Sequence, residues 1–263
     1  MPTRARAIID GWLTIEDLRL ETFHKGEGAP LLLLHGGGGL DHRAPFLAML
    51  AERYELIAPS HPGFGRSPLP DRFDSVDDLA YLYLDLLDAL DLRDIILMGF
   101  SLGGWIAAEI AVRCAHRLSK LILVGPVGIK VGDRENRDIP DIFALSPEEV
   151  TRLAFHDAAK AVVDYGKLTD EELRIVARNR ESLALYTWEP YMHNPKLRHR
   201  LGRIRIPTML IRGASDGLIS RAYIDAYAAA IRNSRVAEIE AAGHSPEIER
   251  PREFVRMAAA FAG

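Results

Sequence analysis

Short, continuously apolar runs alternate with longer amphipathic segments along most of the chain. Runs of this kind between glycine and proline residues are typical of strands buried on both faces, as in a parallel sheet. The intervening segments, such as 76–90 and 105–115, place apolar residues at i, i+3, i+4 and i+7, which predicts helices. The alternation predicts an α/β fold with a parallel sheet covered by helices. The predicted strands include Leu31–Leu34, Glu55–Ala58, Ile95–Met98, Leu121–Val124, Thr208–Ile211 and Arg235–Ile239.

Two parts of the chain depart from this alternation. Near the N-terminus, Trp12–Ile15 and Leu18–Phe23 predict an antiparallel hairpin at the edge of the sheet. Between about 127 and 203 no strong strand pattern occurs, and two capping boxes, Ser146–Glu149 and Thr169–Glu172, predict helix starts. We therefore expect residues 1–126 and 204–263 to form one core domain, with 127–203 inserted in it as a helical lid.

Composition narrows the kinds of partner. The 263 residues carry a net charge of −4 and no basic run, which argues against nucleic acid or an anionic membrane. The longest strongly apolar stretch, Leu31–Leu34, is too short to span a bilayer, and acidic residues follow the N-terminus early, so no signal peptide is expected. A single cysteine, Cys114, excludes a disulfide framework and a cysteine-rich zinc site. We expect a cytoplasmic monomer or homodimer that binds no metal.

One motif predicts a nucleophile. Gly99-Phe-Ser-Leu-Gly103 has the G-x-S-x-G pattern and lies between a predicted buried strand and a predicted helix, the context that this motif requires. A sharp strand-to-helix turn forces the two glycine positions close together, which leaves no room for a Cβ at either. The turn would expose the hydroxyl of Ser101 at a helix N-terminus, where negative charge is favoured.

A serine hydroxyl needs a base within hydrogen-bond reach, and that base needs a third group to orient it. His244 follows the last predicted strand and precedes the last helix, which puts it at the same sheet edge as Ser101. Asp216 follows the strand 208–211 at that edge, whereas Gly125-Pro126-Val127, after the strand 121–124, offers no carboxylate. The order Ser101, Asp216, His244 is that of a hydrolase triad.

A glycine-rich loop follows the first buried strand. His35-Gly-Gly-Gly-Gly39 could bring backbone N–H groups close to a substrate oxyanion. It does not fit a phosphate-binding loop, because no Gly-Lys-Ser/Thr follows and because Asp41 or His42 stands where G-x-G-x-x-G requires glycine. We expect the N–H groups of Gly37 and Leu102 to form the oxyanion hole, with Gly38 as a possible substitute for Gly37.

With these motifs the chain resembles serine hydrolases of the α/β-hydrolase superfamily. The resemblance covers roughly 1–126 and 204–263, through the glycine-rich loop, the segment Ser60–Ser67, the elbow motif and Gly243–Pro251. It implies a mostly parallel sheet of eight strands, a triad of Ser101, Asp216 and His244, and no cofactor. Ser101 argues against epoxide hydrolases and haloalkane dehalogenases, which have aspartate at that position.

Three activities remain open within this resemblance. The glycine-rich loop and the insertion resemble carbon–carbon hydrolases of aromatic ring-cleavage products, but those typically have asparagine and tryptophan where Phe100 and Ser245 stand. Such an enzyme would need a cationic lid residue, with candidates Arg152, Arg174 and Arg178. Some members of the fold are ligand receptors. We expect a carboxylesterase whose substrate is a small-molecule ester with a small to medium apolar acyl group.

Aromatic and aliphatic side chains of the insertion could line the acyl pocket, although residues at helical spacing more often only pack within a lid. The candidates for the pocket, with Gly38 added, are Phe143, Leu145, Phe155, Trp188, Tyr191, Met192 and Leu218.

Overall fold

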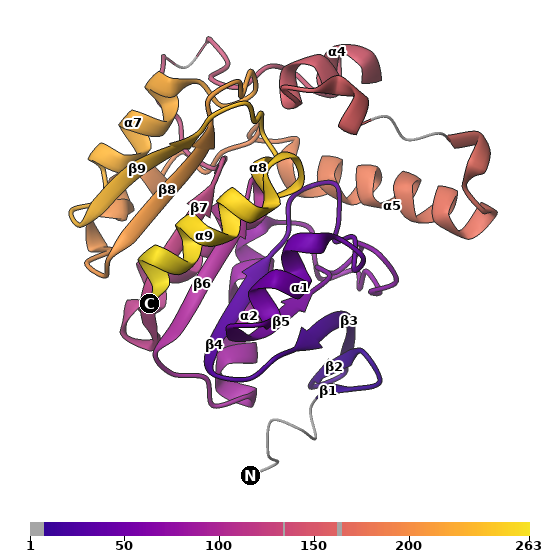
Figure 1. Ribbon diagram of the computed structural model, residues 1–263, viewed down its shortest axis with the longest axis vertical. Helices are drawn as coiled ribbons and strands as arrows, with labels where there is room; N and C mark the ends of the chain where they lie inside the picture. The colour runs from indigo at the N-terminus through magenta and orange to yellow at the C-terminus, as the bar shows by residue number, and fades with distance from the viewer. Residues whose placement is uncertain (1–7, 134, 162–164) are drawn as a thin grey trace.

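The computed structural model describes residues 8–133, 135–161 and 165–263 as a twisted sheet with helices on both faces (Figure 1). The strand order is β1-β2-β3-β5-β4-β6-β7-β8-β9, and the six strands from β5 to β9 in that order run parallel. The predicted α/β fold is confirmed. The strands are β1 Ile8–Ile9, β2 Trp12–Ile15, β3 Leu18–Lys25, β4 Ala29–Leu34, β5 Tyr54–Pro59, β6 Ile95–Phe100, β7 Leu118–Val124, β8 Thr208–Gly213 and β9 Ser234–Ile239.

The N-terminal strands extend the sheet at one edge. The predicted hairpin is present as the antiparallel pair β2 and β3, and β3 continues far enough to pair antiparallel with β5. The sheet has nine strands and not the expected eight. Asp10 and Gly11 both have positive φ, which makes a tight two-residue turn, and the turn lets the two-residue strand β1 pair with β2.

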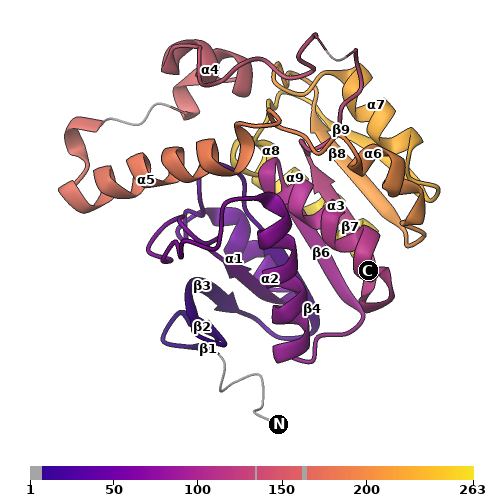
Figure 2. The same ribbon diagram turned by 180° about the vertical axis from the view of Figure 1, so that it is seen from behind.

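Helices cover the sheet on both faces (Figures 1 and 2). Each face has its own hydrophobic cluster. One face carries α1 Pro45–Ala51 and α9 Pro251–Ala262, with the short α8 Pro246–Glu249 packed against both. The other carries α2 Val76–Ala89, α3 Leu102–Cys114 and α7 Arg221–Ala229. Within the described ranges no helix is both long and apolar enough to cross a membrane.

An inserted segment, defined here as residues 125–207, connects β7 to β8 and contains α4 Pro147–Ala154, α5 Asp170–Thr187 and α6 Leu197–Arg200. Both predicted capping boxes are confirmed at the starts of α4 and α5. Figures 1 and 2 show α4 and α5 beyond one end of the parallel strands. Short 3₁₀ turns occur at Ala115–Arg117, Ala158–Lys160, Tyr165–Lys167 and Leu201–Arg203.

The turn from β6 into α3 is packed without room for side chains. A Cβ on Gly99 would lie 2.2 Å from the carbonyl oxygen of Gly103, and a Cβ on Gly103 would lie 2.1 Å from the carbonyl oxygen of Leu34. Both obstacles are backbone atoms, which cannot swing aside. The helix therefore starts against the ends of β4 and β6, as the two glycines of the motif indicated.

A buried polar network holds the start of the glycine-rich loop. The N–H of His61 donates to Nε2 of His35, and Nε2 of His61 lies 3.0 Å from the carbonyl oxygen of His35. Nδ1 of His35 lies 2.7 Å from the carbonyl oxygen of Gly36, and the hydroxyl of Tyr83 lies against Nδ1 of His61. One pair of neutral tautomers satisfies all four contacts. The network thus fixes the backbone where β4 leads into the loop.

The packing at Gly103 predicts that Gly103→Ala lowers the free energy of unfolding by at least about 2 kcal/mol, as overpacking of a core does. Alanine is the better helix former by about 1 kcal/mol, so a net loss must come from the close contact. Urea unfolding measures the change. The control is Gly202→Ala, whose new Cβ would have Ala230 O as its nearest neighbour at 3.9 Å. A Gly103→Ala protein as stable as that control would contradict the close packing.

The buried histidines predict how stability depends on pH. Burial lowers the pKa of His35 to about 4 and that of His61 well below the usual 6.5, to which the charge of His35 also contributes. Both rings are therefore neutral in the fold, whereas each takes up a proton in the unfolded chain below about pH 6.5. Their stabilising contribution is complete above that pH and is lost as the pH falls towards about 4, at up to about 1.4 kcal/mol per histidine and pH unit.

Urea unfolding of wild type and His61→Gln between about pH 4.5 and 7.5 measures this loss. The variant should be less stable at neutral pH, because it lacks the ring's hydrogen bonds, but its stability should fall less steeply on acidification. Slopes must be compared between proteins, since His244 has a raised pKa and acts in the opposite direction. His199→Gln, at an exposed histidine, is the control and should keep the wild-type slope. Equal slopes for His61→Gln and wild type would disprove the assignment.

Candidate active site

A cavity of about 570 Å³ lies between the carboxyl ends of the parallel strands and the inserted segment. Its wall includes Ser101 and Leu102 after β6, the glycines after β4, and His244 after β9. Residues from five separate parts of the sequence meet there because parallel strands end at the same sheet edge. A large, mostly apolar cavity with a few convergent polar groups is typical of an active site.

Ser101 occupies the strained turn between β6 and α3. Its φ is +49° and its ψ is −109°, a backbone conformation that residues with side chains rarely adopt. The N–H of Ser101 donates to the carbonyl oxygen of Val124 at 2.9 Å, which ties the turn to the end of β7. A Cβ on Gly36 would lie 3.4 Å from the Cβ of Ser101, so the glycine-rich loop approaches this residue closely. The strain is held by packing on both sides.

His244 and Asp216 form a hydrogen-bonded pair beside the cavity. Nδ1 of His244 lies 2.9 Å from Oδ2 of Asp216, whose side chain is fully buried. Oδ1 of Asp216 accepts the N–H groups of Leu218 and Ile219, each at 2.9 Å. Burial by itself lowers the pKa of His244, but the charge and hydrogen bond of Asp216 and the charge of Glu247 outweigh it and raise the pKa above its usual value.

The end of β7, where the sequence offers no acid, has a different role. Gly125 has a φ of +48°, and a Cβ there would lie 3.0 Å from Nδ1 and Cε1 of His244 and 3.5 Å from Oδ2 of Asp216. A side chain at this position would press on the hydrogen-bonded pair. The glycine after β7 thus makes room for the pair that comes from β8 and β9.

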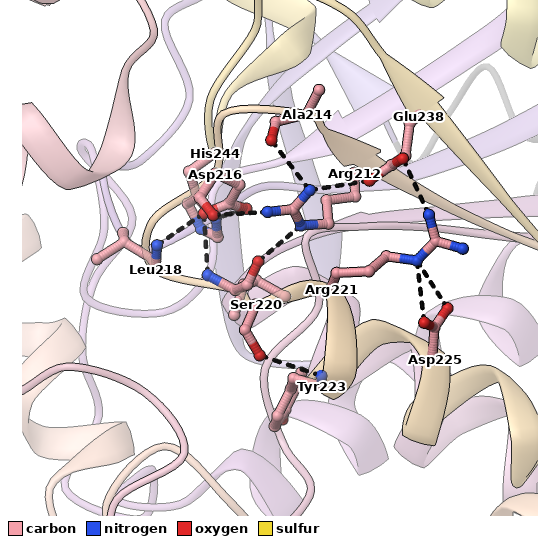
Figure 3. Close-up of polar contacts among 11 residues, drawn as sticks. Arg212, Ala214, Asp216, Leu218, Ser220, Arg221, Tyr223, Asp225, Glu238 and His244 are labelled. Carbon is pink, nitrogen blue, oxygen red and sulfur yellow. Dashed lines mark hydrogen bonds and ion pairs between the residues drawn. The ribbon is translucent and has the colours of Figure 1, made fainter.

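A buried guanidinium holds the loop that carries Asp216 (Figure 3). Arg212, on β8, donates to the carbonyl oxygens of Ala214, Asp216 and Ile219 and pairs with Glu238 on β9 at 2.9 Å. The second oxygen of Glu238 pairs with Arg221, which also binds Asp225 within α7. Because the loop is fixed at three carbonyls, the Asp216 carboxylate keeps its direction towards His244.

Helix α5 is fastened to the core by polar side chains along one face. Asn179 donates to the carbonyl oxygen of Gly38 at 2.8 Å and accepts the N–H of Gly65. Ser182 and Tyr186 donate to the carbonyl oxygens of Gly63 and Pro62. Gly39 N–H closes the glycine-rich turn on Gly36. The inserted segment therefore holds the glycine-rich loop in place and also lines the cavity.

Helix α4 is fastened to the loop of His244. The N–H of His244 donates to the carbonyl oxygen of Ala154 at 2.6 Å. The Glu249 carboxylate accepts the N–H groups of Gly243, His156 and Asp157, so it joins the His244 loop to the end of α4. Both main helices of the insertion thus contact loops that carry predicted site residues.

The structure brings together most of the predicted site residues. Of the predicted triad, Ser101 and His244 line the cavity and Asp216 lies behind His244. The predicted oxyanion donors and most of the pocket candidates also line it, namely Gly37, Leu102, Gly38, Phe143, Phe155, Met192 and Leu218.

The candidates Leu145 and Trp188 need correction, because neither is part of the cavity wall. Trp188 is 55% exposed at the end of α5, where its ring packs against Phe143 from outside. Tyr191 also lies outside the wall, and its hydroxyl donates to the carbonyl oxygen of Pro140. Helical spacing alone does not determine which aromatic side chains face the cavity and which, like that of Trp188, face the solvent.

Sequence reasoning missed several wall residues. Phe46 and Phe100 belong to the core cluster under α1 and α9, and Ile139 and Ile142 come from a stretch without periodicity. Glu247 was also missed, although its place three residues after His244 was a possible signal. Among the described residues no group of His, Cys, Asp or Glu side chains could hold a metal ion.

Known hydrolases resemble the chain over most of its length. The chain is 28% identical over 247 residues to the Azorhizobium caulinodans protein named "Putative carbamate hydrolase RutD", which covers 90% of this chain and 92% of that protein. It is 27% identical over 241 residues to the pimeloyl-[acyl-carrier protein] methyl ester esterase of Aromatoleum aromaticum. That alignment covers 85% of this chain and 94% of the esterase.

The fold is also that of solved hydrolases. The 2-hydroxy-6-oxo-6-phenylhexa-2,4-dienoate hydrolase of Rhodococcus sp. strain RHA1 superposes with a TM-score of 0.77 at 20% identity, covering 97% of this chain and 98% of that one. Similarity at this identity concerns the fold alone. The model of the alpha/beta hydrolase family matches residues 31–257. The protein belongs to the alpha/beta hydrolase family, and hydrolysis is the activity that this membership supports.

Proposed function

We propose that the protein is a serine hydrolase that cleaves carboxylic esters through an acyl-enzyme intermediate. The observation that carries the proposal is that the strained Ser101 and His244 lie in the wall of the same cavity. Nδ1 of His244 is hydrogen-bonded to the buried Asp216. A serine at such a turn with a histidine and an acid in this order has the parts that nucleophilic acyl transfer needs.

In the first half of the reaction the Ser101 oxygen attacks the ester carbonyl carbon. Nε2 of His244 takes the hydroxyl proton, because Nδ1 carries the hydrogen that is donated to Asp216. The tetrahedral intermediate then collapses, His244 returns the proton to the leaving alcohol, and the acyl group remains on Ser101. Asp216 orients the ring and stabilises its positive charge, and Arg212 keeps Asp216 in place.

The negative charge of the intermediate needs donors that are already in position. Leu102 is the first residue of α3, so its N–H has no acceptor within the helix and lies at the positive end of the helix dipole. The N–H of Gly37 is the second donor, on a loop held by Asn179 through Gly38. In the second half, His244 deprotonates a water that attacks the acyl carbon, and Ser101 recovers its proton as the acid leaves.

The cavity favours small to medium uncharged acyl groups. Its wall is mostly apolar, with aliphatic and aromatic side chains from both hydrophobic clusters. In this proposal the core domain is 1–126 with 204–263, and residues 127–203 act as a lid that excludes water from the acyl-enzyme. The methyl ester esterase among the relatives supports the ester bond as the bond that is cleaved.

A carbon–carbon hydrolase is the second candidate, because the fold resembles that of the dienoate hydrolase. Its substrate would bring a carboxylate that needs a cation. Of the lid arginines considered from the sequence, Arg178 donates to the carbonyl oxygens of Gly65 and Ser67, and neither Arg152 nor Arg174 lines the cavity. Arg180 does line it. The acidic Glu247 in the same wall disfavours a carboxylate substrate.

The first prediction concerns the nucleophile. A fluorophosphonate probe should label wild-type protein on the peptide that contains Ser101, as peptide mapping by mass spectrometry would detect. Ser101→Ala should abolish labelling and lower kcat by roughly 10³-fold or more, leaving the rate due to the oxyanion donors. Ser245→Ala, which removes a second serine of the cavity wall, is the control and should label normally. Labelling at Ser245, or persistent labelling of Ser101→Ala, would refute the assignment.

The second prediction concerns substrate class. Assayed side by side, p-nitrophenyl esters of short uncharged acids should have the higher kcat/KM, and a ring-cleavage dienoate the lower. Arg180→Gln should leave kcat/KM for the esters near wild type. A fall in kcat/KM for the dienoate alone would show that Arg180 binds a substrate carboxylate. A roughly hundredfold preference for the dienoate, about 2.7 kcal/mol of transition-state stabilisation, would support the carbon–carbon hydrolase instead. Tight binding of an ester with negligible turnover would indicate a ligand receptor.

A further inference from the structure

Glu247 is a buried acid that neither the fold nor the proposed mechanism uses. It lies on α8, three residues after His244, lines the cavity and is only 9% exposed. Its Oε2 is buried and has no hydrogen-bond partner in the described part of the chain. An orphaned carboxyl oxygen in such a place is costly, because burial removes its water and nothing replaces it.

The neighbouring acid on the same helix shows the contrast. Glu249 accepts three backbone N–H groups and joins two segments, which explains why it is buried. Glu247 has no comparable contact. Burial raises its pKa to about 7, a change to which Glu249 adds, while its own backbone N–H and the nearby His244 act to lower it. The carboxyl thus exists near neutral pH in both protonation states, and each form can accept a hydrogen bond.

The surroundings of Glu247 in the cavity wall are apolar on the side of α1. Leu33, Ala44, Phe46 and Phe100 line the cavity and belong to one hydrophobic cluster, and α8 packs against α1. A polar group of a ligand that enters this part of the cavity could donate to the unpartnered Oε2 of Glu247. A buried acceptor in an apolar wall is how binding sites read a single polar group of a ligand.

On the basis of the proposed ester hydrolysis, we propose that Glu247 is a specificity-determining residue that accepts a hydrogen bond from a hydroxyl or ammonium group of the substrate. The substrate is then not a purely apolar ester: it is an ester that carries a hydrogen-bond donor on its otherwise apolar acyl chain or alcohol. A substrate without the donor leaves the carboxyl unpaired in the closed complex. Sites built in this way discriminate against the analogue that lacks the donor by at least tenfold.

Matched ester pairs test the proposal. In the acyl arm, p-nitrophenyl 3-hydroxybutyrate and 3-aminobutyrate are compared with p-nitrophenyl isovalerate, which has a methyl group in place of the donor. In the alcohol arm, 2-hydroxyethyl butyrate is compared with propyl butyrate. The quantity measured is the ratio of kcat/KM between donor and methyl analogue, for wild type, Glu247→Met and Glu247→Gln. Because ratios are compared between proteins, the intrinsic reactivity of each ester cancels.

Wild type should prefer the donor-bearing ester in at least one arm, and Glu247→Met should lower that ratio tenfold or more. Glu247→Gln, which keeps an acceptor without the charge, should retain part of the hydroxyl preference and lose the ammonium preference. The control is Glu240→Gln, at an exposed acid, which should leave the ratios unchanged. Glu247→Met should also raise the Tm, since it removes an unpaired buried carboxyl, whereas a structural carboxyl would lower the Tm on removal.

Ratios that are the same in wild type and Glu247→Met in both arms, with esters still hydrolysed, would overturn the role of Glu247 and leave the ester hydrolase proposal intact. A protein that hydrolyses none of these esters, p-nitrophenyl butyrate included, would overturn both. A lower Tm for Glu247→Met together with unchanged ratios would assign Glu247 to folding.

Discussion

The contact between β6 and the first turn of α3 is the constraint on which the rest of the site depends. Gly99 and Gly103 bring helix and strand backbone so close that a Cβ at Gly99 would lie 2.2 Å, and one at Gly103 2.1 Å, from a carbonyl oxygen, well inside van der Waals contact. This closeness forces Ser101 into a positive φ and points the start of α3 at the cavity. The neighbouring elements then only have to end at the same edge for their loops to reach Ser101.

The parts that could be predicted from the sequence are those with a local physical cause. The elbow motif requires glycine at two positions, the capping boxes start α4 and α5, and buried strands appear as apolar runs. The partners of Ser101 follow from the rule that parallel strands end at one edge. The pairing of Asp216 with His244 needed no tertiary knowledge beyond that rule.

The rest depended on tertiary contacts that no local pattern encodes. Trp188 and Phe143 lie in one aromatic layer, and only packing decides that Phe143 faces the cavity while Trp188 faces outward. Strand β1 exists because a two-residue turn allows it, not because its residues form a recognisable run. Arg212 directly follows the predicted strand 208–211, and nothing in the local sequence marks it, yet it holds three carbonyls of the Asp216 loop.

Three buried acids near the cavity show how environment assigns different roles to the same chemical group. Asp216 accepts two backbone N–H groups and the His244 ring, so its charge is compensated and directed at the base. Glu249 accepts three backbone N–H groups and serves to join α4 to the His244 loop. Glu247 has an unsatisfied oxygen in the cavity wall. The fold pairs the carboxylates of Asp216 and Glu249 with hydrogen-bond donors but leaves Oε2 of Glu247 unpaired. An unpaired buried oxygen lowers the stability of the free protein, and a hydrogen bond from a bound ligand would offset that loss.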